Sequence, residues 1–229
     1  MRGDISKWRA ISKKFKYWDT EKARKIQRRE SQKIIQWLLD LRLSKYQILE
    51  VGCGNGYLGS LIISVLHKHK LVVTYQFTDL VEECLKKTEK QLGKLLNRRG
   101  ISIKKLDVYL IDKILGPESQ EIIISTGFAA AATYKQAVPR VAKALKPEGI
   151  LICDFVNHLS LPIFMMNFWK FIHRIKVVKN GISASCSNSY HFGKAGIREY
   201  YSLHDLELKK ISTIGWMKNP LLAMFQKKG

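Results

Sequence analysis

The stretch Gln47–Gly59, QILEVGCGNGYLG, constrains the fold more than any other part of the chain. It opens on a short apolar run, Ile48–Val51, of the length and composition expected for a buried parallel strand. Three glycines follow at alternate positions, Gly52, Gly54 and Gly56, and an apolar helical pattern begins directly after them. Glycine permits positive φ and close approach of a ligand, and a helix N-terminus leaves N–H groups that suit an anionic or polar ligand. The stretch therefore predicts a strand, a glycine turn and a helix, although such turns also occur with no ligand.

Glu50, directly before the turn, narrows the interpretation. With it the segment resembles motif I of the class I S-adenosylmethionine-dependent methyltransferases, a strand ending in Glu or Asp followed by x-Gly-x-Gly-x-Gly. It departs from the dinucleotide fingerprint Gly-x-Gly-x-x-Gly, because the third glycine comes one residue early. The resemblance implies S-adenosylmethionine as cofactor; no metal site is expected. The cofactor contacts that it implies in this segment are Glu50, Gly52, Cys53, Gly54, Asn55 and Gly56.

Two further carboxylates follow predicted strands. Asp79 lies a little over twenty residues past the glycines, where α/β nucleotide folds place the acid that accepts both ribose hydroxyls. Its alternative role is to cap the next helix. The resemblance implies that Asp107 meets the adenine amino group with Val108 against the ring, and Asp112 competes with Asp107 for that role. The same resemblance adds Leu80 and Thr126 to the cofactor contacts.

The resemblance extends along the chain and predicts an α/β, Rossmann-like, doubly wound sheet. Seven strands are expected, mostly parallel with an antiparallel C-terminal strand, plus a cap insertion. The sequence of residues 134–145 predicts a helix. We expect this helix to end at the turn Lys146–Gly149 and a strand to follow at residues 150–155. Ser202–Asp205 has the spacing of a capping box and predicts a short last helix. Residues 211–216 and 221–226 then predict the closing pair of strands.

We expect one domain over residues 1–229, divided into four parts. The N-terminal helical segment is 1–46, with a helix at about 21–41 capped by Asp19 or Thr20. The cofactor-binding core is 47–156, the cap or lid insertion is 157–201, and the last helix and strand pair are 202–229.

The insertion is rich in aromatic side chains and methionine, which provide area and adaptable packing for a hydrophobic acceptor. Two other interpretations stay open: a basic and apolar helix that rests on a membrane surface, and aromatic residues that only complete the core. His158 is the first candidate for a general base because it follows the fifth strand, with His191 and His204 as alternatives. The candidate substrate contacts are Tyr17, Phe128, Tyr190 and Arg198.

Composition excludes several classes of protein. The four cysteines are scattered and form no CxxC pair, which argues against zinc and against a disulfide framework and fits a reducing compartment. No apolar run is long enough to cross a bilayer, and the N-terminus lacks the apolar core of a signal peptide. These features predict a cytoplasmic protein, with a position at the edge of a membrane as an alternative.

The net charge of +21 is distributed unevenly. Residues 1–46 carry +9 and residues 157–229 carry +8, whereas the core between them carries only +4. Basic flanks of this kind attract RNA or an anionic membrane surface, although a lysine-rich composition alone also produces them.

The first hypothesis is a methyltransferase that acts on a small, hydrophobic or amphiphilic acceptor, such as a metabolite or a lipid-like molecule, by in-line transfer. The second is an RNA methyltransferase that modifies a 2′-hydroxyl or the cap through the basic flanks. The Asn/Asp-Pro-Pro-Tyr/Phe signature of base amino methylation is absent, since residues 125–128 read Ser-Thr-Gly-Phe. The third is a non-catalytic cofactor-binding or scaffold protein. The oligomeric state is not predicted.

Overall fold

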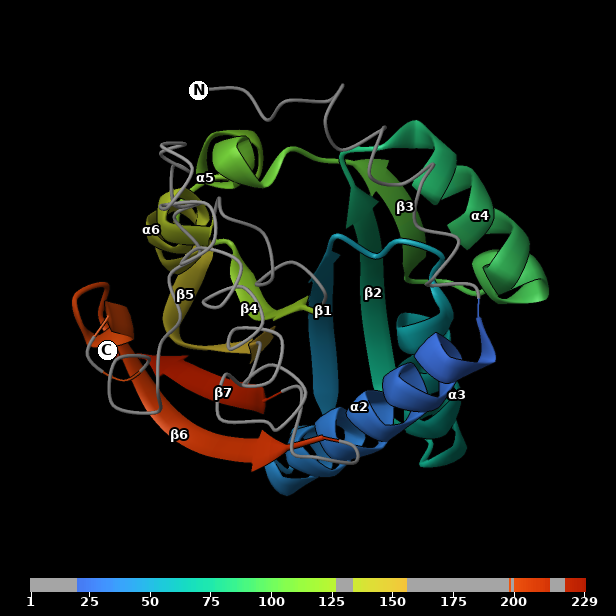
Figure 1. The fold of residues 1–229 in the computed structure, drawn as a ribbon, viewed down its shortest axis with the longest axis horizontal. Coiled ribbons are helices and arrows are strands. Elements are labelled where there is room, and N and C mark those ends of the chain that lie inside the picture. The colour runs from blue at the N-terminus through green and yellow to red at the C-terminus, as the bar shows by residue number, and fades with distance from the viewer. Residues whose placement is uncertain (1–19, 127–133, 156–197, 199, 215–220) are drawn as a thin grey trace, which may run out of the picture.

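A computed structural model of the chain describes residues 20–126, 134–155, 198, 200–214 and 221–229 (Figure 1). Seven strands form one sheet in the order β3-β2-β1-β4-β5-β7-β6. They are β1 (Lys45–Val51), β2 (Val72–Asp79), β3 (Ile101–Lys105), β4 (Gln120–Ser125), β5 (Leu145–Phe155), β6 (Leu206–Thr213) and β7 (Leu221–Lys227). The pairs among β1 to β5 are parallel, and β7 is antiparallel to both β5 and β6. The predicted mostly parallel, seven-stranded sheet is therefore confirmed.

Helices connect the strands and cover both faces of the sheet (Figure 1). The α-helices are α2 (Glu21–Asp40), α3 (Tyr57–Lys68), α4 (Glu82–Leu92), α5 (Ile111–Ile114) and α6 (Tyr134–Ala144), with the 3₁₀ turns η2 (Gly93–Asn97) and η3 (Val108–Leu110). Helix α2 begins as predicted, because the Thr20 Oγ1 accepts a hydrogen bond from the Ala23 N–H at 3.3 Å. None of the helices in the described ranges combines the length and the apolar character needed to span a bilayer.

Two apolar clusters lie on opposite faces of the sheet because strand side chains alternate. In β4, Ile122 and Ile124 join the cluster formed with α2, α3 and Leu92 of α4. Ile123 points the other way, into the cluster formed with η3, α5 and α6. A sheet buried on both faces needs apolar residues at successive positions, which explains the continuous runs in its central strands.

The strand order reverses between β1 and β4. From β1 the chain proceeds outward through β2 to β3, and from β4 it proceeds outward through β5 on the other side. In open α/β sheets, ligands bind beyond the carboxyl ends of the strands at such a reversal. The glycine turn leaves the carboxyl end of β1, at this point of the sheet (Figure 1).

The prediction of a helix that starts at Ser202 is wrong. Residues 200–202 are helical, but the chain then turns at Asp205, which has a left-handed φ of +57°. Strand β6 begins at once with the buried Leu206, five residues earlier than predicted. The Lys228 N–H also donates to the Asp205 carbonyl at 2.8 Å. Pairing with β7 therefore prevails over the local capping signal.

The Lys-Pro-Glu-Gly segment also differs in detail from its prediction. Helix α6 ends at Ala144 and β5 starts at Leu145, so the four residues lie within the strand. They form a local irregularity, because the pairing with β4 passes from Leu145 directly to Ile150. Glu148 takes a φ of +62° there, and a Cβ on Gly149 would lie 2.7 Å from the Lys146 carbonyl oxygen. The turn is thus a tight bulge at the amino edge of the sheet.

Candidate functional site

The glycine turn has the backbone conformation that its sequence predicts. Gly52, Gly54 and Gly56 have φ values of +74°, +59° and +73°, a region that residues with a Cβ rarely adopt. Gly56 is the residue immediately before α3.

The turn is attached to the end of β2. The Thr78 carbonyl accepts from the N–H groups of Gly52 and Cys53 at 2.8 and 2.9 Å. The next residue of β2, Asp79, accepts from the Gly54 N–H through Oδ2 at 3.0 Å. From α4, the Thr88 hydroxyl donates to the Gly54 carbonyl at 3.1 Å. Sequence reasoning missed both threonines, since neither belongs to a recognisable motif.

These contacts change the expectation that the turn offers N–H groups to a ligand. Besides the three amides held by β2, the Gly56 N–H donates to the Cys53 carbonyl at 2.9 Å. The Tyr57 N–H donates to the Asn55 side-chain oxygen at 3.2 Å. Five amides of the segment 52–57 are therefore satisfied within the protein. This arrangement differs from a phosphate cradle, which depends on free main-chain donors.

The turn offers open space instead of donors. A Cβ built on Gly52 or on Gly54 would meet no atom within 4 Å. A Cβ on Gly56 would lie 2.7 Å from the Thr88 methyl group, so the third glycine allows α4 to pack. The first two glycines are consequently the ones that leave room for a ligand.

Glu50, two residues before the turn, is 2% exposed and packs against Gly59 of α3. The Tyr75 hydroxyl donates to its Oε2 at 3.0 Å, and the Thr78 hydroxyl donates to its carbonyl at 2.7 Å. Burial raises the pKa of this carboxyl to about 8; the Tyr75 hydrogen bond lowers the pKa and the charge of Asp79 raises it. Glu50 is therefore an acid that titrates close to neutral pH.

Asp79 ends β2 beside the glycine turn. Its Oδ1 accepts from the Val81 N–H at 2.9 Å, while its Oδ2 holds the Gly54 amide. Burial raises the pKa of Asp79, and these backbone hydrogen bonds lower it. Val81, not Asp79, is the N-cap of α4, so the capping alternative does not hold in its simple form. Each carboxylate oxygen can accept a second hydrogen bond, which leaves capacity for ribose hydroxyls.

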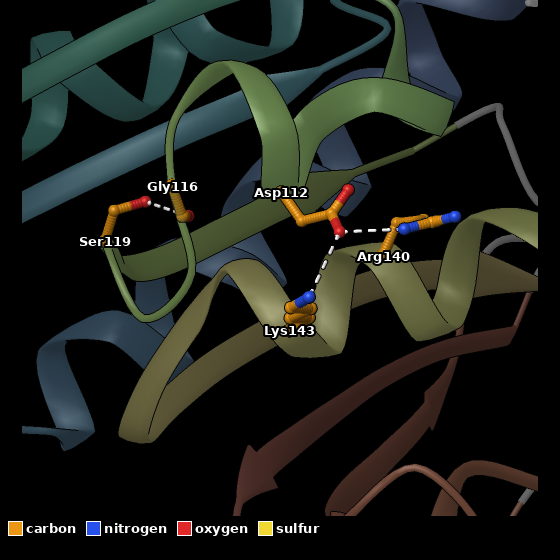
Figure 2. Close-up of polar contacts among 5 residues, drawn as sticks. All are labelled: Asp112, Gly116, Ser119, Arg140 and Lys143. Carbon is orange, nitrogen blue, oxygen red and sulfur yellow. Dashed lines mark hydrogen bonds and ion pairs between the residues drawn. The ribbon is translucent and has the colours of Figure 1, made fainter.

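Asp107 follows β3 and caps η3, where its Oδ1 accepts from the Tyr109 N–H at 3.0 Å. Val108, the next residue, is buried. The competing Asp112 is engaged elsewhere: its Oδ2 binds Arg140 at 2.9 Å and lies 3.9 Å from the Lys143 Nζ (Figure 2). Asp112 is therefore paired with cations of α6, whereas Asp107 lies just beyond the end of β3.

The remaining predicted contacts divide into described and undescribed residues. Leu80, Asn55 and Thr126 are half-buried. Cys53 is buried with its Sγ 3.4 Å from the Thr88 hydroxyl, and burial raises the pKa of its thiol, so it is no nucleophile. Five predicted residues lie outside the described ranges, as does most of the predicted lid: Tyr17, Phe128, His158, Tyr190 and His191.

Two predicted acceptor-side residues are described. Arg198 is exposed. His204 lies two residues before β6, which starts opposite Lys227, whereas the carboxyl end of β5 at Phe155 lies opposite Leu221. The register therefore places His204 near the amino edge of the sheet, away from the carboxylates. Over the described part of the chain, no group of three or more His, Cys, Asp or Glu side chains is arranged to hold a metal ion.

No protein-family model matches this sequence. Over 143 residues, 62% of the chain, it is 24% identical to the non-reducing polyketide synthase dbaI of Emericella nidulans, and it spans 5% of that protein's length. The chain is therefore comparable to a small part of that synthase.

Solved structures show the same fold. The magnesium protoporphyrin IX methyltransferase from Synechocystis PCC 6803, with bound SAH, has a TM-score of 0.60 and 13% identity, over 87% of this chain and 82% of that chain. The DszA carbon methyltransferase has a TM-score of 0.61 and 14% identity, over 87% and 54%. The CMeT domain of the citrinin polyketide synthase has a TM-score of 0.58 and 15% identity, over 81% of this chain and 47% of that chain. The chain thus has the Rossmann-like fold of the class I S-adenosylmethionine-dependent methyltransferases.

Proposed function

We propose that this chain is an S-adenosylmethionine-dependent methyltransferase that acts on a small, hydrophobic or amphiphilic acceptor. The observation that carries the proposal is the composition of one edge of the sheet. Asp79 and Asp107 lie at or just beyond the carboxyl ends of β2 and β3, beside an open glycine turn in which five amides are already satisfied. That edge suits a ligand with hydroxyl and cationic groups better than one with phosphates.

The residues present fit S-adenosylmethionine in this respect. The space over Gly52 and Gly54 admits a ligand against the main chain. Asp79 accepts the ribose hydroxyls, Asp107 accepts from the adenine amino group, and Leu80 and Val108 contact the base. When bound, the cofactor supplies a methyl group that its sulfonium already activates, so the protein must mainly align the acceptor and exclude water.

The acceptor is proposed from the neighbours and from the composition of the insertion. The similar structures include a methyltransferase named for magnesium protoporphyrin IX, a carbon methyltransferase and the CMeT domain of a polyketide synthase. The aromatic and methionine side chains of residues 157–201 match an apolar acceptor in character. In this proposal Tyr17, Phe128, Tyr190 and Arg198 contact the acceptor, and His158 is the base where a proton must be removed.

Cofactor binding is tested by titration calorimetry with S-adenosylhomocysteine, comparing Gly54→Ala with Gly116→Ala. Both glycines have positive φ, +59° and +87°, and a Cβ on either would meet nothing within 4 Å. The two variants therefore carry similar backbone strain. Gly116 lies in the turn before β4, at the opposite edge of the sheet, where its carbonyl accepts from Ser119 (Figure 2).

We expect Gly54→Ala to weaken binding by about tenfold or more, which corresponds to at least about 1.4 kcal/mol. Gly116→Ala should bind like the wild type. Equal losses in both variants would show that strain, not occupation of the site, reduces binding. A wild-type protein that binds neither S-adenosylhomocysteine nor S-adenosylmethionine would contradict the proposal and favour a scaffold role.

The acceptor class is tested by transfer of a labelled methyl group into separated fractions of small metabolites, lipids and RNA. Label in the metabolite or lipid fraction supports the proposal. Label in RNA, with an affinity that falls steeply as salt rises, supports the alternative in which the basic flanks bind nucleic acid. A single domain, a cytoplasmic location and contact with an anionic membrane surface remain predictions from the sequence.

A further inference from the structure

Ser125, the last residue of β4, has a buried hydroxyl with no hydrogen-bond partner. The residue is 6% exposed. Buried polar groups are almost always paired, and each exception requires an explanation.

The other buried serines and threonines of the described chain are satisfied. The hydroxyls of Ser31 and Ser60 donate within their helices to carbonyls three residues earlier, at 2.8 and 2.7 Å. Those of Thr78 and Thr88 donate to carbonyls of the β1 and glycine-turn segment, at 2.7 and 3.1 Å. Ser125 is therefore the exception among the buried serines and threonines of the described chain, although Gln27 and Asp112 each also carry one buried side-chain oxygen without a hydrogen-bond partner.

Its position in a strand explains why no local acceptor serves it. A helical serine can reach the carbonyl one turn back, but a strand side chain stands perpendicular to the sheet while the carbonyls lie in its plane. Ser125 pairs with Cys153 of β5, and it follows Ile123 on the face covered by α5 and α6. Any partner of the hydroxyl must come from beyond the end of β4.

That position is the binding edge. Ile124 pairs with Glu50 of β1, so Ser125 lies one residue further toward the carboxyl edge, level with Val51, the residue before the glycine turn. The space over Gly52, the first residue of that turn, is open. The orphaned hydroxyl and the open glycine thus lie on the two strands between which the strand order reverses.

We infer that Ser125 is a cofactor-binding residue whose hydroxyl forms a hydrogen bond with S-adenosylmethionine; the inference rests on the proposed function. Sequence reasoning placed a contact at Thr126 and passed over Ser125, because the burial of a short polar side chain at a strand end is not visible in the sequence. A hydroxyl both donates and accepts, so it suits any polar group of the ligand.

The test compares Ser125→Ala, Ser125→Thr and the control Ser31→Ala, with two measurements: the Tm of the ligand-free protein and the affinity for S-adenosylhomocysteine. Ser125→Ala removes an unsatisfied buried group. The Tm of the ligand-free variant should therefore be the same as that of the wild type, or higher by at most about 4 °C. Its affinity should fall by about three- to tenfold, the range for one neutral hydrogen bond. Ser125→Thr keeps the hydroxyl and should restore most of the affinity.

Ser31→Ala should behave in the opposite way, with a lower Tm and an unchanged affinity, because its hydroxyl is bonded within α2. A ligand-free Tm that falls in Ser125→Ala would reveal a structural partner and overturn the inference. Unchanged affinity in Ser125→Ala, with a wild type that binds, would also overturn it while leaving the proposed function intact. A wild-type protein that binds no cofactor would contradict both the inference about Ser125 and the proposed function.

Discussion

Replacing Glu50 by glutamine should make the protein more stable at neutral and alkaline pH. The side chain is 2% exposed and its carboxyl has a pKa of about 8, against an ordinary value of 4.5. Glutamine has nearly the same shape, can still accept the hydrogen bond from the Tyr75 hydroxyl, and never ionises. The substitution therefore isolates the effect of the charge.

The magnitude follows from proton linkage. Between pH 4.5 and 8 the folded protein holds a proton on Glu50 that the unfolded chain has lost. The free energy of unfolding consequently falls as pH rises, by about 1.4 kcal/mol per pH unit from this group. The wild type should lose about 3 kcal/mol by pH 7, and about 4 kcal/mol by pH 8, relative to its stability at pH 4.5. Glu50→Gln should lose none of this contribution.

The assay is urea denaturation of both proteins at pH 5, 6, 7 and 8. The quantity of interest is the difference in unfolding free energy between variant and wild type, in which the other titrating groups cancel. We expect this difference to grow by about 1.4 kcal/mol per pH unit. Glu89→Gln, at an exposed position of α4, provides a control whose difference should stay flat. A flat difference for Glu50→Gln as well would refute the reasoning, since it would mean that the buried carboxyl titrates normally.

Three further predictions concern the scaffold of the site. Gly59→Ala should lower the free energy of unfolding by about 1–3 kcal/mol in urea, because the new Cβ would overlap a buried carboxylate and an aromatic ring; unchanged stability would contradict the packing. Arg140→Met should destabilise by about 1–3 kcal/mol, and by more than Asp112→Asn, since only the former leaves a buried carboxylate without its nearest cation; the reverse order in denaturation would refute this. Glu30→Gln should raise Tm at pH 7 but not near pH 4, because burial and the charge of Asp154 raise the pKa of Glu30; an equal effect at both pH values would exclude that cause.

The positions of the core strands and of the carboxylates near their ends could be predicted because each signal is local. Glu50, Asp79 and Asp107 all follow short apolar runs, and parallel strands bring their carboxyl ends to one edge. The glycine spacing likewise requires only neighbouring residues to be interpreted.

Other features could not be predicted, because they depend on partners distant in the sequence. Three amides of the glycine turn are satisfied by Thr78 and Asp79, about 25 residues later, so the sequence suggested free donors that the fold removes. The capping-box pattern at Ser202 predicted a helix, but the chain forms strand β6 there because β6 pairs with β7. The unpaired hydroxyl of Ser125 is visible only once its neighbours are placed.

The attachment of the glycine turn to β2 has a consequence for how binding is controlled. Because Thr78 and Asp79 hold three of its amides, the turn loses its conformational entropy during folding. Ligand binding therefore does not have to order the turn again. The amides of Gly52, Cys53 and Gly54 should accordingly exchange slowly with solvent deuterium even before a ligand is added. Preorganisation of this kind also makes the site depend on its neighbouring strand: a local opening that detaches the end of β2 would abolish cofactor binding while the rest of the sheet stays folded.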